Sequence, residues 1–397
     1  MLHTINQTIA VSLNNIRSLP QRLGASSVAV FGTACVVGVF ISVLSMAAGF
    51  QKTMFTAGSD NTYIVTREGS TSELASGLSY EQTQLIANEP GVAHDEYDQP
   101  IASAELFVIV DIPKKTTDTA ANVPLRGVQE QAFKVRDNVK LVEGRMFNLG
   151  QNELIVGRAA QGQFSGLKVG DTIKLGQSKW SIVGAFEDGG SVSESELWCD
   201  ARILQQVYRR GNSFQSVRVK LNDKAALTEF KAALASDPRL TVGIQSEKEY
   251  YAAQARGLTT FIKWVGYPLA ILMAIGAIFA AINTMYSSVS ARTREMATLR
   301  ALGFGNTPIV LSVLIESVLL AFVGSLIGSI IVYAVFNGYT VSTMNGQTFS
   351  QVVFAFSVTP NLLWQGINAA VWIGLIGGIF PAVHAIRVPV VMALREM

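Results

Sequence analysis

The sequence predicts a membrane protein with four transmembrane helices and a large α+β extracytoplasmic domain between helices 1 and 2. Only 15% of the 397 residues are charged, whereas average soluble proteins carry about 25%. Asp, Glu, Lys and Arg are absent from residues 26–50, 264–291 and 317–386. About 20 apolar residues cross the hydrocarbon core of a bilayer, so the last stretch is long enough for two helices.

The expected elements follow from these stretches in chain order. A cytoplasmic amphipathic helix should precede span 1, with an apolar face for the membrane interface formed by Ile5, Ile9, Leu13 and Ile16. Span 1 is interpreted as a signal anchor, because its apolar core exceeds the roughly 7–15 residues of a cleaved signal peptide. The expected segments are 1–24 (amphipathic helix), 25–49 (span 1), 50–261 (periplasmic domain), 262–288 (span 2), 289–307 (cytoplasmic loop), 308–337 (span 3), 338–361 (short periplasmic loop), 362–384 (span 4) and 385–397 (cytoplasmic tail).

The distribution of arginine predicts the orientation. If the N-terminus lies in the cytoplasm, the three cytoplasmic segments hold seven arginines against two glutamates. This excess agrees with the positive-inside rule. We therefore expect a multi-pass protein of the cell inner membrane, with both termini cytoplasmic and the large domain periplasmic.

Short β-type runs alternate with turn signals in the predicted periplasmic domain, as in an ordinary folded domain. Strand-helix-strand units are expected at about 60–110 and 213–250, on either side of a strand-rich insert at about 111–212. Ser79 and Gln82 have the spacing of a capping box at the start of the helix in the first unit.

Motifs for enzymatic chemistry are missing from the sequence. It contains no G-x-x-x-x-G-K-[ST] phosphate loop, no H-E-x-x-H pair and no G-x-S-x-G elbow. Glu194 and Glu196 would share one face of a strand, but no histidine or metal-ligand spacing accompanies them, so a solvated surface is favoured over an acid/base pair. The chain is expected to bind no cofactor and no metal and not to be an enzyme by itself. Its net charge of +2, without a basic run, argues against nucleic-acid binding.

Glu316 is an isolated carboxylate within span 3. An ionisable group at membrane depth is a functional-site candidate, but without a Lys, Asp or His partner it gives little support for an ion or proton relay. Capping of a neighbouring helix or contact with a lipid headgroup is favoured. Glycines at G-x-x-x-G spacing let helix backbones approach closely and favour packing and, more weakly, dimerisation. They are Gly324 and Gly328 in span 3 and Gly374 and Gly378 in span 4.

The cytoplasmic loop should contain a short helix that ends at Gly303, because glycine is favoured just after a helix C-terminus. At about 100° per residue, its apolar side chains share a face with an arginine and a glutamate. Two interpretations stay open: a helical turn with the usual inside arginines, or a helix that docks into a groove of another protein. The docking residues would be Arg292, Arg294, Glu295, Met296, Leu299, Arg300 and Leu302.

Several motifs together carry a resemblance. In the C-terminal half they are Ser290-Ala-Arg-Thr-Arg-Glu-Met-Ala-Thr-Leu-Arg-Ala-Leu-Gly303, Leu314-Ile-Glu-Ser317, Gly324-Ser-Leu-Ile-Gly328, Pro381-Ala-Val-His-Ala-Ile-Arg387, Pro389 and Ala393-Leu-Arg395. In the periplasmic domain they are Glu143-Gly-Arg145, Glu153-Leu-Ile-Val-Gly157, Val169-Gly-Asp171 and Val183-Gly184. The first set closely resembles the FtsX-like permease domain of the MacB/FtsX/LolC class, the type VII ABC transporters. The second set is similar to the MacB-like periplasmic core domain.

The resemblance implies a permease subunit served by a separate cytoplasmic ATPase dimer, which would bind ATP and Mg²⁺. MacB itself carries its ATPase at its N-terminus, whereas about 24 residues precede span 1 here. The loop helix would be the coupling helix that sits on the ATPase. The other partners implied are the lipid bilayer, a second permease copy (identical or a paralogue), a periplasmic membrane-fusion adaptor and a TolC-like outer-membrane channel.

The implied activity is export of an amphipathic substrate by mechanotransmission, in which ATP hydrolysis moves the periplasmic domain. Two alternatives from the same class stay open: an FtsX-like regulator that activates a cell-wall hydrolase, and LolC/E-like release of lipoproteins. An ion-coupled transporter is disfavoured, because it would need more spans and paired ionisable groups.

Overall fold

The computed structural model describes residues 2–18 and 23–387, which fall into two compact units. The helical unit consists of the described residues of 1–48, 261–339 and 357–397. The interhelical domain consists of residues 49–260 and 340–356.

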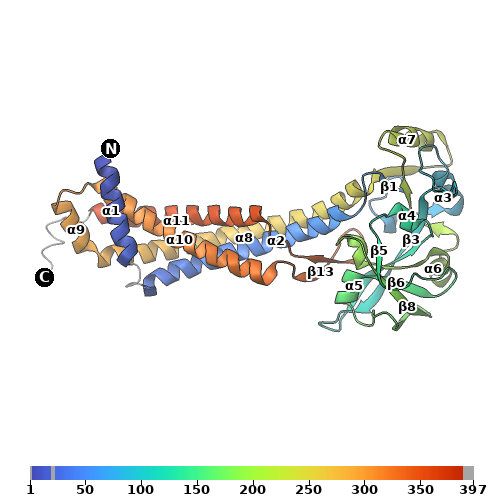
Figure 1. The fold of residues 1–397 in the computed structure, drawn as a ribbon, viewed down its shortest axis with the longest axis horizontal. Coiled ribbons are helices and arrows are strands. Elements are labelled where there is room, and N and C mark those ends of the chain that lie inside the picture. Colours follow the sequence, from blue (N-terminus) through green and yellow to red (C-terminus); the bar gives the residue numbers. More distant parts are fainter. Residues whose placement is uncertain (1, 19–22, 388–397) are drawn as a thin grey trace. The chain divides into compact units, whose positions relative to one another are not determined.

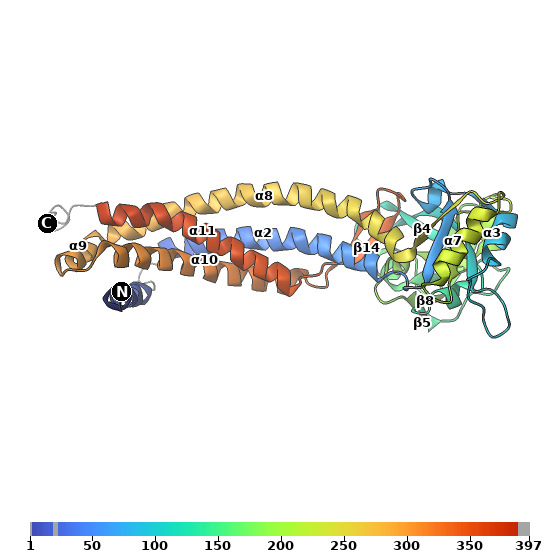
Figure 2. The ribbon, with the colours of Figure 1, turned by 90° about the horizontal axis from the view of Figure 1, so that it is seen from above.

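Four long helices contain the apolar stretches (Figures 1 and 2). They are α2 (Leu23–Thr56), α8 (Glu247–Ala291), α10 (Asn306–Phe336) and α11 (Pro360–Arg387). Among the described residues, these four are long and apolar enough to cross a membrane. With the α/β domain between the first and the second of them, they confirm the predicted fold class.

α2 and α8 continue past the predicted spans 25–49 and 262–288. α8 has 45 residues, and at 1.5 Å per residue it is roughly 68 Å long. The hydrocarbon core is only about 30 Å thick, so much of α8 lies outside it. The helix continues there because the flanking Gln, Lys, Ala and Arg residues are good helix formers.

α1 (Leu2–Ser18) contacts α10 and has one buried and one exposed face. The buried side chains are Val11, Ser12 and Asn15. The exposed side chains include Ile5, Ile9 and Leu13, which were predicted to face the membrane interface. The side chain of Ile16 and residues 388–397 of the predicted tail lie outside the described residues. An exposed apolar stripe of this kind is what an interfacial helix presents to lipid.

The four G-x-x-x-G glycines lie at helix contacts within the chain. A Cβ atom on Gly324 or Gly328 of α10 would lie 2.5 Å from a backbone oxygen of α2, that of Val30 or Ala34 respectively. On α11, a Cβ at Gly374 would lie 2.9 Å from the Ala321 Cβ atom, and one at Gly378 would lie 2.8 Å from the Ser317 Cβ atom. α10 can therefore approach both α2 and α11 because these positions lack side chains.

The interhelical domain is built on a ten-stranded sheet in the order β12-β1-β11-β3-β4-β9-β6-β8-β5, with β7 paired to β8. Its strands are β1 (Thr62–Arg67), β3 (Ala102–Pro113), β4 (Ala120–Val128), β5 (Lys140–Gly144), β6 (Glu153–Gly157), β7 (Thr172–Leu175), β8 (Ser178–Glu187), β9 (Leu197–Asp200), β11 (Ser216–Lys220) and β12 (Val242–Ser246). The short strands β2 (Leu78–Ser79) and β10 (Ser213–Phe214) form a separate pair. The helices are η2 (Glu73–Ala75), α3 (Tyr80–Ala87), α4 (Ala132–Val135), α5 (Arg158–Gln163), η3 (Val192–Ser195), α6 (Ala201–Val207) and α7 (Ala226–Ser236).

The long strand β3 joins the two halves of this sheet. Its residues 102–105 pair with β11 and its residues 106–113 pair with β4, both antiparallel. The strands expected as an insert at about 111–212 therefore continue the same sheet as the strand-helix-strand units. α3 begins at the capping box expected from Ser79 and Gln82, with both of its hydrogen bonds present.

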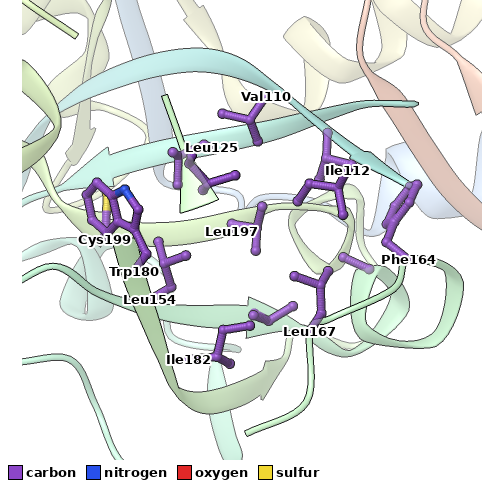
Figure 3. Packing of buried hydrophobic residues seen from close by; sticks show 14 of the residues in the cluster. Val110, Ile112, Leu125, Leu154, Phe164, Leu167, Trp180, Ile182, Leu197 and Cys199 are labelled. Atoms are coloured by element: carbon purple, nitrogen blue, oxygen red, sulfur yellow. The ribbon is translucent and has the colours of Figure 1, made fainter. Parts of the chain in front are cut away.

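Each half of the sheet has its own apolar core. In the β4–β9 half, Leu125, Leu154 and Leu197 pack around Trp180, and all four are completely buried (Figure 3). In the β1–β11 half, Val65 and Val219 pack with Phe230 of α7. Between the two cores the sheet carries buried charge, described below.

The segment between α10 and α11 folds as part of the interhelical domain. It forms the hairpin β13 (Thr340–Met344) and β14 (Gln351–Ala355). Val353 is 3% exposed and joins the same core as Leu197. The Val353 N–H donates to the Ser195 Oγ atom at 2.9 Å. The predicted short loop 338–361 is thus a docked hairpin, because its run of buried apolar residues fills a place in the core.

Candidate functional site

The predicted loop helix is α9 (Thr293–Ala301), which lies between α8 and α10. Arg292 is its N-cap residue. Gly303 has a φ of +93°, a left-handed conformation that glycine adopts without strain, and it ends the helix. Pro308 lies in the first turn of α10, where a missing N–H costs no helical hydrogen bond.

A buried ion pair joins α9 to α10. Arg292 Nη2 donates to Glu316 Oε2 at 2.9 Å, and the two side chains are 5% and 3% exposed. Ser288 Oγ, near the end of α8, donates to Glu316 Oε1 at 3.2 Å. One carboxylate of α10 therefore holds the last turn of α8 and the N-cap residue of α9. Among the described parts of the chain no cluster of three metal-ligating side chains occurs.

The structure divides the predicted docking residues between two surfaces. Arg292 is buried, whereas Met296 is half-buried and packs against the core around Ile309 and Val313. The docking face itself stays a prediction, because helical periodicity does not reveal which side of a helix meets its own chain. The exposed docking candidates are Arg294, Glu295 and Leu302, and the half-buried ones are Leu299 and Arg300.

A cavity of about 220 Å³ adjoins Glu316. Its polar lining comes from Ser26, Thr284, Ser287 and Ser288, together with the carboxylate. Met285, Ala291 and Leu320 complete the lining, so the hydroxyl groups and the carboxylate share this cavity with apolar side chains.

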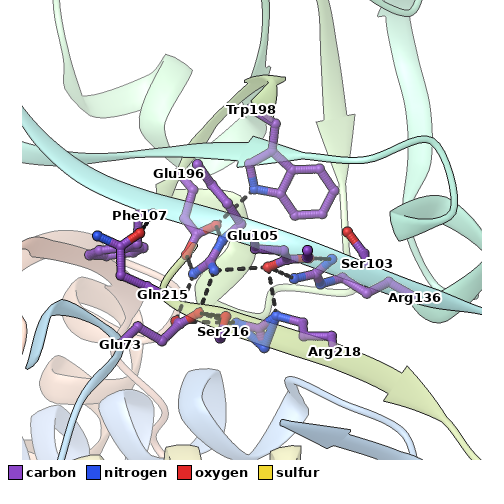
Figure 4. Close-up of polar contacts among 12 residues, drawn as sticks. Glu73, Ser103, Glu105, Phe107, Arg136, Glu196, Trp198, Gln215, Ser216 and Arg218 are labelled. Carbon is purple, nitrogen blue, oxygen red and sulfur yellow. Dashed lines mark hydrogen bonds and ion pairs between the residues drawn. The ribbon is translucent and has the colours of Figure 1, made fainter. Parts of the chain in front are cut away.

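A second charged site is the ionic cluster in the interhelical domain (Figure 4). Its members are Arg126, Arg136, Arg218, Glu73, Glu105, Glu196 and Glu247, all of them buried. Four carboxylates face three guanidiniums, so the formal charge of the cluster is −1. Sequence reasoning identified none of these ion pairs.

Glu105 of β3 is the centre of the ionic cluster and accepts from all three guanidiniums. Arg126 Nη1 lies 2.9 Å from Glu105 Oε2. Arg136 binds the same carboxylate through two hydrogen bonds of 2.7 and 2.8 Å. Arg218 Nε donates to Glu105 Oε2 at 2.8 Å. Such bidentate and shared contacts offset the cost of removing the charges from water.

Glu196 was predicted to lie on a solvated surface, and this prediction was wrong. It is 3% exposed, and it accepts from Arg126 at 2.6 and 2.7 Å and from Trp198 Nε1 at 2.7 Å. Glu194 is also buried, and its carboxylate accepts from the N–H groups of Asp188 and Gly190. No local sequence pattern predicts such partners, since Arg126 lies 70 residues from Glu196 in the sequence.

The ionic cluster binds the first turns of α8. Arg218 Nη1 donates to Glu247 Oε1 at 2.7 Å, and Arg218 Nη2 donates to the Tyr251 hydroxyl at 3.2 Å. The Tyr250 hydroxyl accepts from the Glu73 N–H at 3.1 Å. Since Glu247, Tyr250 and Tyr251 all belong to α8, the cluster anchors the beginning of this helix to the centre of the sheet.

Opposite charges keep the cluster ionised. Burial raises the pKa of Glu73, but Arg126 and Arg218 lower it more, so the pKa lies well below its ordinary value. Burial also raises the pKa of Glu105, but the neighbouring guanidiniums, Arg136 above all, lower it more, so the pKa is lowered overall. Burial lowers the pKa of Arg126, but Glu196 and Glu73 raise it far above the usual value. Glu73, Glu105 and Arg126 are therefore charged at neutral pH.

A chain with four apolar helices and a large α/β domain between the first two has the architecture of a transporter permease. Two family models match it: the MacB-like periplasmic core domain over residues 26–237 and the FtsX-like permease C-terminal domain over residues 268–390. The first model alone matches more than half of the chain. The chain belongs to the MacB family of type VII ABC transporter permeases.

Curated relatives share this family. The macrolide export ATP-binding/permease protein MacB of Pasteurella multocida is 25% identical over 73% of this chain and 45% of its own length. The protein of the same name from Bdellovibrio bacteriovorus is 25% identical over 99% of this chain and 61% of its own length. The chain thus spans about half the length of the curated relatives it matches.

Two solved structures resemble parts of this chain. The crystal structure of the periplasmic region of MacB from Actinobacillus actinomycetemcomitans has 15% sequence identity and a TM-score of 0.37, over 48% of this chain and 90% of that one. The extracellular domain of the ABC-type transporter YknZ from Gram-positive bacteria has 14% identity and a TM-score of 0.36, over 47% of this chain and 100% of that one.

Proposed function

We propose that this chain is the permease subunit of an ABC exporter whose ATPase is a separate cytoplasmic dimer. The observation that carries the proposal is α9, a short helix that exposes Arg294, Glu295 and Leu302 while Arg292 fastens it to α10. An exposed leucine beside charged groups is suited to binding in a groove of a partner protein. A buried ion pair can transmit a displacement of α9 to α10, because breaking the pair is costly. The names of the relatives, which join ATP-binding and permease functions, support the same assignment.

Coupling would pass through the contacts of Glu316. When ATP-driven closure of the ATPase displaces α9, the Arg292–Glu316 pair moves α10 with it. The bond from Ser288 to the same carboxylate moves α8. α8 is one uninterrupted helix as far as Glu247, and there the ionic cluster receives the displacement. The partner would bind ATP and Mg²⁺, and this chain would transmit the resulting movement to its interhelical domain.

The remaining parts of the proposal concern location and partners. We place the chain in the inner membrane with both termini cytoplasmic, because residues 1–24, 289–307 and 385–397 hold seven arginines against two glutamates. A second permease copy would complete the transmembrane assembly. A membrane-fusion adaptor and an outer-membrane channel would receive an amphipathic substrate from the periplasmic side.

The test is purification of the tagged full chain from its own cells in mild detergent, with mass spectrometry of the bound proteins. We expect an ABC ATPase and a periplasmic adaptor. Leu302→Asp should lose the ATPase and keep the adaptor, because Leu302 is 73% exposed on the proposed docking surface. Leu149→Asp is the matched control, since this leucine is 56% exposed in the interhelical domain, and it should keep both partners.

Two results would contradict the exporter proposal. A folded wild-type preparation that retains no ATPase would remove the coupling role. An ATPase together with a cell-wall hydrolase, and without an adaptor, would favour the regulatory alternative.

A further inference from the structure

The interhelical domain carries a polar groove of about 750 Å³ between α3 and α6, which the proposed coupling does not use. Tyr80 and Gln84 of α3 form one wall. Arg202 and Gln206 of α6, with the turn after this helix, form the other wall. The complete lining is Tyr80, Gln84, Gln129, Ala201, Arg202, Gln205, Gln206, Arg209, Gly211, Asn212 and Phe214. The volume lies in the range of roughly 300–1,000 Å³ that is usual for small-ligand sites.

The groove is electropositive. Arg202 and Arg209 contribute two guanidiniums, both exposed, and no aspartate or glutamate belongs to the lining. Within the described part of the chain, neither guanidinium forms an ion pair, whereas seven other arginines are paired with carboxylates. Exposed, unneutralised guanidiniums on the wall of a concave site favour an anionic ligand.

The floor of the groove is fixed and offers further donors. The Gln129 Oε1 atom accepts from the Ala104 N–H at 2.9 Å, which leaves the Gln129 amino group to face a ligand. Gln205 is 7% exposed, and its Nε2 atom donates to the Ser213 carbonyl at 2.9 Å. Beneath them Phe214 is 4% exposed in the core of the domain. The amide groups are therefore held in place before any ligand arrives.

The turn that carries Arg209 is also held in a defined conformation. Arg209 has a φ of +52°, in the left-handed region that non-glycine residues seldom occupy. Its N–H donates to the Gln206 carbonyl at 3.2 Å, and the next N–H, of Arg210, donates to the Gln205 carbonyl at 2.9 Å. These bonds keep Arg209 on the rim of the groove.

We propose that this groove binds an anion that carries further hydrogen-bonding groups, that is, a phosphate or carboxylate on a hydroxylated body. Two arginines would hold the anion, and the glutamine, asparagine and tyrosine groups would bind hydroxyls. A protein partner fits less well, because interface centres are apolar and aromatic, whereas amides and guanidiniums dominate here. The proposal concerns binding by this chain alone and stands independently of ATP-driven coupling.

The experiment is isothermal titration of the full chain in phosphatidylcholine nanodiscs with glucose 6-phosphate, glucose and inorganic phosphate. We expect glucose 6-phosphate to bind more tightly than either fragment. Arg202→Gln and Arg209→Gln should each weaken it about tenfold, since a charge-assisted hydrogen bond is lost. Arg210→Gln is the matched control: this neighbour is exposed but does not line the groove, and affinity should stay within about twofold.

A second set of titrations distinguishes the source of the ligand. Short-chain phosphatidylglycerol, below its micelle concentration, tests a lipid headgroup against short-chain phosphatidylcholine. Binding of phosphatidylglycerol that depends on Arg202 and Arg209 would assign the groove to anionic lipids, and binding of glucose 6-phosphate alone would assign it to soluble anions. Both results support the proposal.

The proposal is overturned if neither ligand binds the folded chain, or if Arg210→Gln weakens binding as much as Arg202→Gln. Binding of an acidic peptide in place of both small anions would also overturn it, in favour of a protein partner. Leu302→Asp should leave all affinities for these ligands unchanged. A failure of the coupling proposal, which the purification tests, can therefore be told apart from a failure of the groove proposal, which the titrations test.

Discussion

Arg292 donates to Glu316 at 2.9 Å across 24 residues of sequence, and this bond joins the N-cap of α9 to α10. Two residues that looked unrelated in the sequence, one a docking candidate and the other an isolated intramembrane carboxylate, thus form one unit. Because both side chains are almost completely buried, water cannot take the place of either partner, and breaking the pair destabilises the fold. It links the N-cap of the proposed coupling helix to α10 through side chains.

Glu316→Gln should destabilise the helical unit by about 3–5 kcal/mol, because it leaves the Arg292 guanidinium buried without this counter-charge. The ATPase should still bind, since the proposed docking surface that includes Leu302 is unchanged. ATP hydrolysis should no longer drive export. Thermal unfolding in detergent and transport in vesicles measure the two effects. The double variant Arg292→Met/Glu316→Met should recover most of the stability, and a double variant no more stable than Glu316→Gln would contradict this account.

Arg218→Met should destabilise the interhelical domain by about 3–5 kcal/mol, because it leaves four carboxylates with two guanidiniums. It also removes the bonds to Glu247 and Tyr251 that hold the start of α8. Pulse proteolysis of the full chain reports the stability. Arg158→Met is the control, as this arginine is 53% exposed and its ion pairs are 3.6 and 3.9 Å long; it should change stability by less than about 1 kcal/mol.

The ionic cluster should tolerate mild acid. The pKa values of Glu73 and Glu105 are lower in the folded chain than the ordinary glutamate value of about 4.3. Their stabilisation is therefore fully present above about pH 4.3 and is lost only as the pH falls below it towards the folded pKa values. Unfolding of the interhelical domain, followed by proteolysis between pH 7 and 3, should show no loss from this source above pH 5. Stability that stays constant as the pH falls from about 4.3 to 3 would mean that the pKa values of these carboxylates are not lowered in the folded chain.

Gly328→Ala should lower stability by about 1–3 kcal/mol through overpacking. Its new Cβ atom would lie 2.5 Å from the Ala34 carbonyl oxygen, a backbone atom that cannot rotate away. Gly276→Ala is the matched control on α8, where a Cβ atom meets nothing within 4 Å, and it should be neutral or slightly stabilising because alanine is the better helix former. Equal thermal unfolding of the two variants would argue against close contact between α10 and α2.

Val353→Asp should release the β13–β14 hairpin from the interhelical domain, because it places a charge in the core around Leu197. Accelerated cleavage of residues 340–356 by a protease would report the release. Met344→Asp, on the same hairpin but 50% exposed, should leave the cleavage rate close to that of the wild type. If Val353→Asp is cleaved no faster than Met344→Asp, the hairpin is not held by this core.

Features that depend on neighbouring residues could be predicted from the sequence. Uncharged apolar stretches identified four helices, since length and composition decide whether a helix can cross a bilayer. The Ser79–Gln82 capping box and the end of α9 at Gly303 followed from spacing and backbone freedom. The resemblance to the MacB family rested on local motifs, and the family models match the corresponding regions.

Which buried groups meet could not be predicted from the sequence and depends on the folded arrangement of the chain. The Glu196–Arg126 and Glu316–Arg292 pairs join residues 70 and 24 positions apart, and periodicity says which residues share a face but not what lies opposite that face. The docking of β14 beside Ser195, across 158 residues, is of the same kind. A charge or polar group that is removed from water needs a hydrogen-bond or ion-pair partner, because burying it without one is costly. The packing of the sheet and helices determines which element supplies that partner.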